Sequence, residues 1–160
     1  MSIFKVKALC LLVVLSLSFA LLTGCTKSKD PVSNDKFESA ARQVGYIVQD
    51  GTDYFAAYEY VKLVTLASPQ DKAYQIEYYE LNDEAVAKSF YESNKSNFVM
   101  LKGEESLETN ETGENYDLYK LENNGKYMMI ERVDRTVVYV HSTDIGNKSA
   151  IEKFLEEIGY

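Results

Sequence analysis

The sequence predicts an α+β domain: an antiparallel sheet with helices packed on one face, in the order helix, two strands, helix, three strands, helix. Two observations carry this prediction. Apolar residues with helical spacing occur near both ends and in the middle of the chain, and runs rich in Tyr, Val and Leu are separated by short turn sequences. About 136 residues follow an apolar N-terminal segment of 24, which is enough for one domain.

The first predicted helix has apolar residues spaced i, i+3, i+4 and i+7, which places them on one face. They are Phe37, Ala40, Ala41 and Val44. Ser33, Asn34 or Asp35 caps the start, because short polar side chains accept hydrogen bonds from the first free backbone amides. Gly45 fits the left-handed position just past the end of the helix.

Three runs in the first half of the chain predict strands. Residues 46–49 form a short run, residues 58–67 are dominated by Tyr, Val, Leu and Thr, and residues 73–81 include alternating apolar and polar side chains. The turn sequence Ser-Pro-Gln-Asp at 68–71 joins the last two runs. An antiparallel hairpin is therefore expected here.

The second half begins with a helix that Asn82 or Asp83 caps and that continues to about residue 97. Residues 102–115 are polar and are predicted to form a loop. Three strands with tight turns between them follow. They are expected at residues 116–122, 126–133 and 136–141. A helix over about residues 147–158 closes the chain.

The first and last helices end alike, in Gly45-Tyr46 and Gly159-Tyr160. The apolar positions before these pairs also match, at a constant offset of 114 residues. Duplication of a half-domain explains the match. Convergence also explains it, because a helix that ends in a glycine cap favours a hydrophobic residue next, and we prefer this interpretation.

The N-terminal segment has the pattern of an export signal. Lys5 and Lys7, with no acidic residue, precede a nearly continuous apolar stretch at 8–22. This stretch is shorter than the roughly 20 residues that a membrane-spanning helix needs, which favours a removable signal. The stretch ends in Leu22-Thr23-Gly24-Cys25.

These four residues resemble the lipobox of bacterial lipoproteins, although a secretory signal with a chance cysteine has similar features. The resemblance implies that the Cys25 thiol is acylated, palmitate being one such acyl group, and that residues 1–24 are removed. Residues 25–34 then form a flexible lipidated tether and residues 35–160 a single domain on the extracytoplasmic face of the cell membrane. The outline of that domain resembles small lipoproteins of Gram-positive bacteria, which implies no function and no site.

Charge and cysteine content restrict the chemistry that the domain performs. Removal of residues 1–24 takes away two lysines and no acid, so the formal charge changes from −8 to −10. Such a domain is repelled by nucleic acid and by anionic lipid headgroups. Cys10 leaves with the signal and Cys25 is acylated, so no thiol remains for a disulfide, a zinc site or catalysis. No cofactor or metal site is expected.

Histidine and carboxylates are the residues to consider for catalysis. His141 is the only histidine, and the adjacent Ser142 points to the other face of its strand, so a packed or surface role is expected. Four acids converge around a strand-to-helix junction, where a pair of carboxylates suits glycoside hydrolysis. They are Glu77, Glu80, Asp83 and Glu84. Solvated strand faces and favourable first-turn acids are the preferred explanation.

The acidic residues of the 102–115 loop match no calcium-binding loop, so a solvated loop is expected. The 13 tyrosines, with no tryptophan, are more unusual. Tyrosine favours recognition surfaces because it offers area, rigidity and a hydroxyl group, but it is also common in strands. The candidate binding surface comprises Tyr58, Tyr60, Tyr74, Tyr78 and Tyr79.

The function favoured by the sequence is a non-catalytic binding or interaction domain that is anchored outside the membrane through Cys25. Its partner is an envelope protein, a peptide or a glycan, and no catalytic residue is assigned. The alternative is a small hydrolase that acts on cell-envelope substrates with carboxylates near Glu80 and Glu84. A purely structural accessory subunit is a third interpretation.

Overall fold

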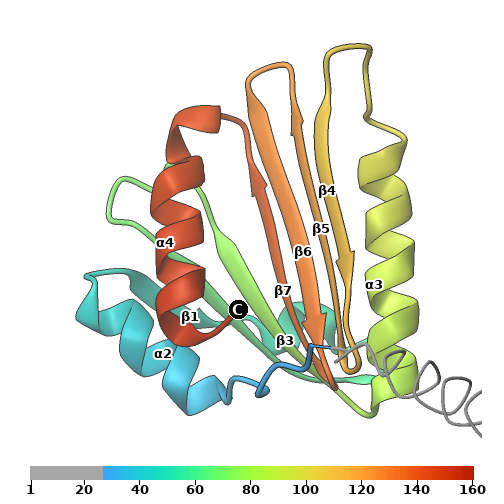
Figure 1. Ribbon diagram of the computed structural model, residues 1–160. Helices are drawn as coiled ribbons and strands as arrows, with labels where there is room; N and C mark the ends of the chain where they lie inside the picture. The colour runs from blue at the N-terminus through green and yellow to red at the C-terminus, as the bar shows by residue number, and fades with distance from the viewer. Residues whose placement is uncertain (1–26) are drawn as a thin grey trace, which may run out of the picture.

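The computed structural model describes residues 27–160, and their core is one antiparallel sheet of seven strands (Figure 1). The strand order is β1-β2-β3-β7-β6-β5-β4. The strands are β1 (Ile47–Asp50), β2 (Val61–Ser68), β3 (Ile76–Leu81), β4 (Leu107–Thr112), β5 (Tyr116–Asn123), β6 (Lys126–Val133) and β7 (Thr136–Ser142). The helices are α2 (Asn34–Gln43), α3 (Glu84–Val99) and α4 (Lys148–Ile158), with 3-10 turns η1 (Thr52–Phe55) and η2 (Ile145–Asn147). The predicted α+β class and antiparallel sheet are confirmed.

The helices cover both faces of the sheet rather than the single face expected from the sequence. On β3, Ile76 and Tyr78 pack in the core beneath α2 and α4, whereas Tyr79 and Leu81 pack in a second core beneath α3. Figure 1 shows α2 and α4 together and α3 apart from them. The physical reason is that the central strands have apolar residues at successive positions, so both faces need cover.

Helices α2 and α4 contact each other across the first face. The rings of Phe37 and Phe154 lie edge to face with their centroids 5.7 Å apart. Edge-to-face pairs are favourable because the positive edge of one ring meets the negative face of the other. The two ends of the described chain are therefore joined in one core.

The helix caps agree with the sequence. Ser33 Oγ accepts a hydrogen bond from the amide of Lys36, and the Asp83 carboxylate accepts one from Val86. Gly45 and Gly159 are both left-handed, with φ of 84° and 103°. The amide of the following tyrosine bonds back to a carbonyl five residues earlier in both cases. This capping geometry accounts for the similar helix ends without a duplication.

Strand β4 was not predicted, because it lies in the expected 102–115 loop. All six of its residues are exposed, and it forms the edge of the sheet beside β5. A strand without a buried face has no alternating apolar pattern, so the sequence contains no signal for it. Polar edge strands also resist pairing with other chains.

Residues 27–33, which we name the strap, lie against the domain, although a flexible tether was expected for 25–34. Val32 is 2% exposed and belongs to the core beneath α2 and α4. The predicted signal and Cys25 lie outside the described residues. Among residues 27–160 no helix combines the length and apolar character needed to cross a membrane.

Candidate functional site

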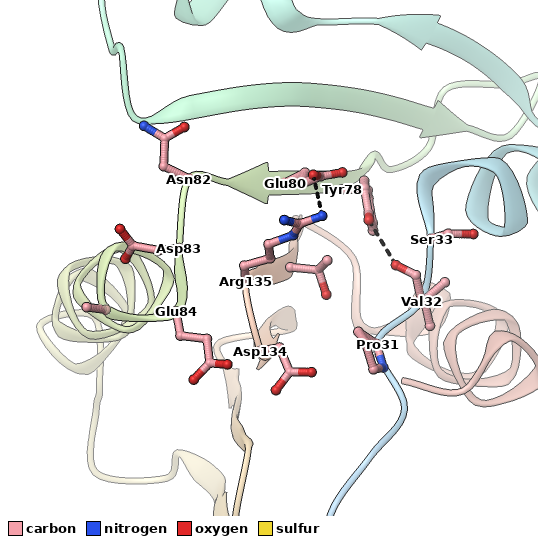
Figure 2. A pocket seen from close by; sticks show the side chains of 12 residues that line it. Pro31, Val32, Ser33, Tyr78, Glu80, Asn82, Asp83, Glu84, Asp134 and Arg135 are labelled. Carbon is pink, nitrogen blue, oxygen red and sulfur yellow. Dashed lines mark hydrogen bonds and ion pairs between the residues drawn. The ribbon is translucent and has the colours of Figure 1, made fainter.

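A cleft of about 850 Å³ lies where β3 leads into α3, beside the turn between β6 and β7 (Figure 2). We name it the acidic cleft. Its charged lining residues are Glu80, Asp83, Glu84, Asp134 and Arg135. The sequence placed three of these acids at a strand-to-helix junction, and the fold brings them to one cleft. The strap closes its other side through Pro31, Val32 and Ser33.

Most charges of the acidic cleft already have partners. Arg135 forms an ion pair with Glu80 at 3.0 Å, and Figure 2 shows its guanidinium turned toward Glu80 rather than toward Glu84. Asp83 caps α3, and Asp134 accepts a hydrogen bond from Asn115. Within residues 27–160, Glu84 makes no ion pair or side-chain hydrogen bond, so its carboxylate is available to a ligand.

Tyr78 forms part of the floor of the acidic cleft. Its hydroxyl donates a 2.9 Å hydrogen bond to the carbonyl of Val32, which joins the sheet to the strap. Burial, with a smaller contribution from the charge of Glu80, raises the pKa of Tyr78 well above its usual range. The phenol is therefore neutral and serves as a hydrogen-bond donor.

A second cleft, of about 660 Å³, lies between α3 and the segment that joins β1 to β2. We name it the aromatic groove. Its aromatic residues are Phe55, Tyr58, Tyr60 and Phe90. Tyr58 and Tyr60 have ring centroids 5.6 Å apart and are 49% and 39% exposed. Ser89, Ser93 and Asn94 of α3 add polar groups to its lining.

The two clefts meet at the beginning of α3. Asp83 and Ala85 line both of them. The first turn of one helix therefore lies between a cleft lined by four carboxylates and a groove lined by four aromatic rings. A ligand that extends across this turn contacts both.

The structure divides the five tyrosines proposed as a binding surface. Tyr58 and Tyr60 line the aromatic groove, whereas Tyr74, Tyr78 and Tyr79 are 9%, 0% and 3% exposed and belong to the cores. Tyr78 and Tyr79, as neighbours on β3, point to opposite faces of the sheet. Both are buried, however, because helices cover both faces of the sheet.

Several residues of the two clefts were missed in the sequence as ligand-binding candidates, among them two aromatic residues and one arginine. These three are Phe55, Phe90 and Arg135. Phe90 appears in the sequence as an apolar position of a helix, and Arg135 as a turn residue. Nothing in their local patterns distinguishes a groove from a core, because the groove exists only where the η1 segment crosses α3.

His141 lies away from both clefts. It is exposed, and its ring lies edge to face with that of Phe98, with the two ring centroids 6.5 Å apart. Ser142 is buried, and its hydroxyl donates to the carbonyl of Asp144. No group of three or more His, Cys, Asp or Glu side chains within residues 27–160 is placed to hold a metal ion.

Two ion pairs that involve buried side chains occupy opposite faces of β6. Arg132 bonds to Asp117 at 2.9 Å on the face of α3, and each side chain is 8% exposed. Glu131, 1% exposed, pairs with Lys29 of the strap beside α4. Burial raises the pKa of Glu131, although Lys29 opposes the shift.

Comparison of the chain with protein-family models, curated proteins and solved structures finds no match.

Proposed function

We propose that this protein is a lipid-anchored extracytoplasmic domain that binds a polypeptide segment without catalysis. The bound segment has a basic side chain in the acidic cleft and an apolar or aromatic side chain in the aromatic groove. The observation that carries the proposal is the meeting of these two clefts at Asp83 and Ala85. Cys25, which lies outside the described residues, is the proposed site of the lipid.

Size supports a polypeptide rather than a small molecule. Pockets for small ligands have volumes of roughly 300–1,000 Å³. Each cleft is by itself of this size, at about 850 and 660 Å³, and together they exceed it. An extended chain advances about 3.3 Å per residue, so a few residues reach from one cleft to the other.

Charge complementarity supports a basic partner. Four carboxylates and one guanidinium line the acidic cleft, and the mature chain has a formal charge of −10 under the proposed processing. Complementary potentials accelerate encounter and suppress wrong partners. The exposed rings of Tyr58 and Tyr60 supply the area and rigidity that recognition surfaces use, and their faces attract cations.

A photoreactive phenylalanine analogue tests the proposed surface in the native membrane. Placed at Ser93, which lines the aromatic groove, it is expected to capture a polypeptide. The matched control is Lys88, which is exposed on the same helix and lines neither cleft. Capture from Ser93 is expected to fall several-fold in Tyr60→Ala and in Glu84→Lys. Equal capture from both positions, or capture that neither substitution reduces, contradicts the proposal.

A carboxylate-dependent hydrolase is the second candidate, because Glu80, Asp83 and Glu84 converge on one cleft. Against it, Glu80 is held by Arg135 and Asp83 caps α3, which leaves Glu84 as the acid without such a role. Turnover of a cell-wall or peptide substrate that both Glu80→Gln and Glu84→Gln abolish, in protein that still folds, would establish this function instead of the binding function.

A further inference from the structure

The strap is bound along its length by contacts to one end of the sheet. The amide of Glu114 donates to the carbonyl of Lys27 at 2.9 Å. The side chain of Asn115 accepts from the amide of Lys29 at 3.0 Å and donates to its carbonyl at 2.8 Å. These contacts attach the strap to the turn between β4 and β5.

Deeper contacts continue the attachment toward α2. Lys29 forms an ion pair with the buried Glu131, and its ammonium lies over the ring of Tyr116, 5.1 Å from the centroid. Val32 is buried, and its carbonyl accepts the hydroxyl of Tyr78. The strap is therefore part of the folded domain as far back as Lys27.

This attachment limits how far a lipid on Cys25 lies from the domain. Only Thr26 separates Cys25 from Lys27. A fully extended chain spans at most about 3.6 Å per residue, so the two backbones are no more than about 7 Å apart. A flexible tether of ten residues would instead allow separations of tens of ångströms.

We infer that the strap holds the domain directly on the lipid surface, with the β4–β5 and β6–β7 turns facing the membrane. This inference rests on the proposed lipidation of Cys25. The two turns are adjacent, because Asn115 of the first donates to Asp134 of the second at 3.0 Å. The end of the domain formed by the strap and these two turns has charges of both signs, with Lys27, Glu114 and Asp134 among its residues. Because such a surface has no strong attraction of its own for lipid, the acyl chains supply the attachment.

The orientation also places the acidic cleft at the membrane-proximal end of the domain. Pro31, Asp134 and Arg135 line the cleft and belong to the strap and to the β6–β7 turn. Pro31 is six residues from Cys25, which limits its distance from the lipid-bearing residue to about 20 Å. The polypeptide segment that the cleft binds is therefore presented close to the membrane surface.

Single tryptophans report the orientation without background, because the chain contains none. Glu114→Trp places the reporter beside Lys27, and Lys126→Trp places it at the far end of the hairpin of β5 and β6. The eight residues of β5 separate the two ends by about 26 Å. Both native side chains are exposed, and neither makes an ion pair or side-chain hydrogen bond within residues 27–160.

The experiment uses the full chain, expressed in bacteria, purified with its lipid and reconstituted in phosphatidylcholine vesicles that contain brominated lipid. Quenching is expected to be several-fold stronger for Glu114→Trp than for Lys126→Trp. A variant with eight Gly and Ser residues inserted between Thr26 and Lys27 gives the domain about 16 Å of additional reach, and in this variant the difference should largely disappear. Circular dichroism verifies that each variant is folded.

The outcomes separate this inference from the proposed function. Mass spectrometry of the purified protein shows whether Cys25 has acyl chains. An unmodified Cys25 overturns the proposed anchoring and the orientation with it. An acylated Cys25 with equal quenching at both tryptophans overturns the orientation alone. Unequal quenching that the insertion leaves unchanged shows that something other than the short strap orients the domain, and also overturns the inference.

Discussion

Asn115→Ala is predicted to release the strap while the sheet remains folded. The substitution removes two hydrogen bonds to the backbone of Lys29 and a third to the carboxylate of Asp134. A neutral hydrogen bond contributes about 0.5–1.5 kcal/mol net, and one to a charged group somewhat more. Asn115 is only half-buried, so water replaces part of each bond. We therefore expect the free energy that holds the strap against the domain to fall by about 2–3 kcal/mol.

A loss of this size raises the open fraction of the strap by about 30- to 150-fold, since each 1.4 kcal/mol is a factor of ten. Native-state trypsin digestion measures the effect. Cleavage after Lys27 and Lys29 requires the strap to leave the domain, and its rate follows the open population when opening is fast relative to cleavage. Cleavage at Lys120, within β5, reports global unfolding in the same sample.

Asn110→Ala is the matched control, because Asn110 lies in β4 and its side chain accepts a hydrogen bond only from Lys95 of α3. Its digestion pattern should equal that of the native protein. Equal strap cleavage in Asn115→Ala and in the native protein would refute the conclusion that Asn115 holds the strap against the domain. Cleavage at Lys120 that accelerates as much as cleavage in the strap would show that the substitution destabilises the whole domain. The strap would then not open independently of global unfolding.

Three further predictions concern stability. Burial raises the folded-state pKa of Glu131, so the folded protein binds this proton more tightly than the unfolded chain does, and stability should decline as pH rises from about 4.5 toward the folded value. Glu131→Gln should remove this decline in urea titrations between pH 4.5 and 7, and parallel profiles would contradict the assignment. Asp117→Ala should lower the free energy of unfolding by about 3–5 kcal/mol, because it leaves the Arg132 guanidinium buried and unpaired. Replacing both partners with apolar residues should lower it clearly less. Equal losses of stability in urea denaturation would contradict this prediction. Gly45→Ala should lower the free energy of unfolding by about 1–2 kcal/mol, because alanine is strained at the positive φ of this position, while an added Cβ has open space around it. An unchanged melting temperature in thermal melts would contradict the strained conformation.

The elements that the sequence predicted correctly have strong local signals. Phe37 and Ala41 lie at helical spacing behind a Ser33 cap, and the three C-terminal strands lie between tight turns. Such signals depend on the preferences of a few neighbouring residues, so they can be recognised without knowledge of the fold. Strand β4 lacks one because all of its residues are exposed and its place in the sheet comes from backbone pairing with β5.

The candidate site was partly predictable. The grouping of Glu80, Asp83 and Glu84 follows from their positions at a strand-to-helix junction, which is local information. The inclusion of Arg135 is not local, because β7 pairs with β3 only in the tertiary structure. Tyrosine content likewise shows neither which rings are exposed nor which are core, since that depends on which faces the helices cover.

The sequence by itself determined the class of the fold and the ends of the helices, and it predicts an export signal before Cys25, because each depends on residues close together in the chain. The tertiary structure decided which sheet face each helix covers, which tyrosines remain on the surface, and that residues 27–33 belong to the domain. A polar segment such as the strap resembles a linker in sequence. It becomes part of the fold through Asn115, Glu131 and Tyr78, which lie 86, 102 and 46 residues along the chain from the strap residues that they contact.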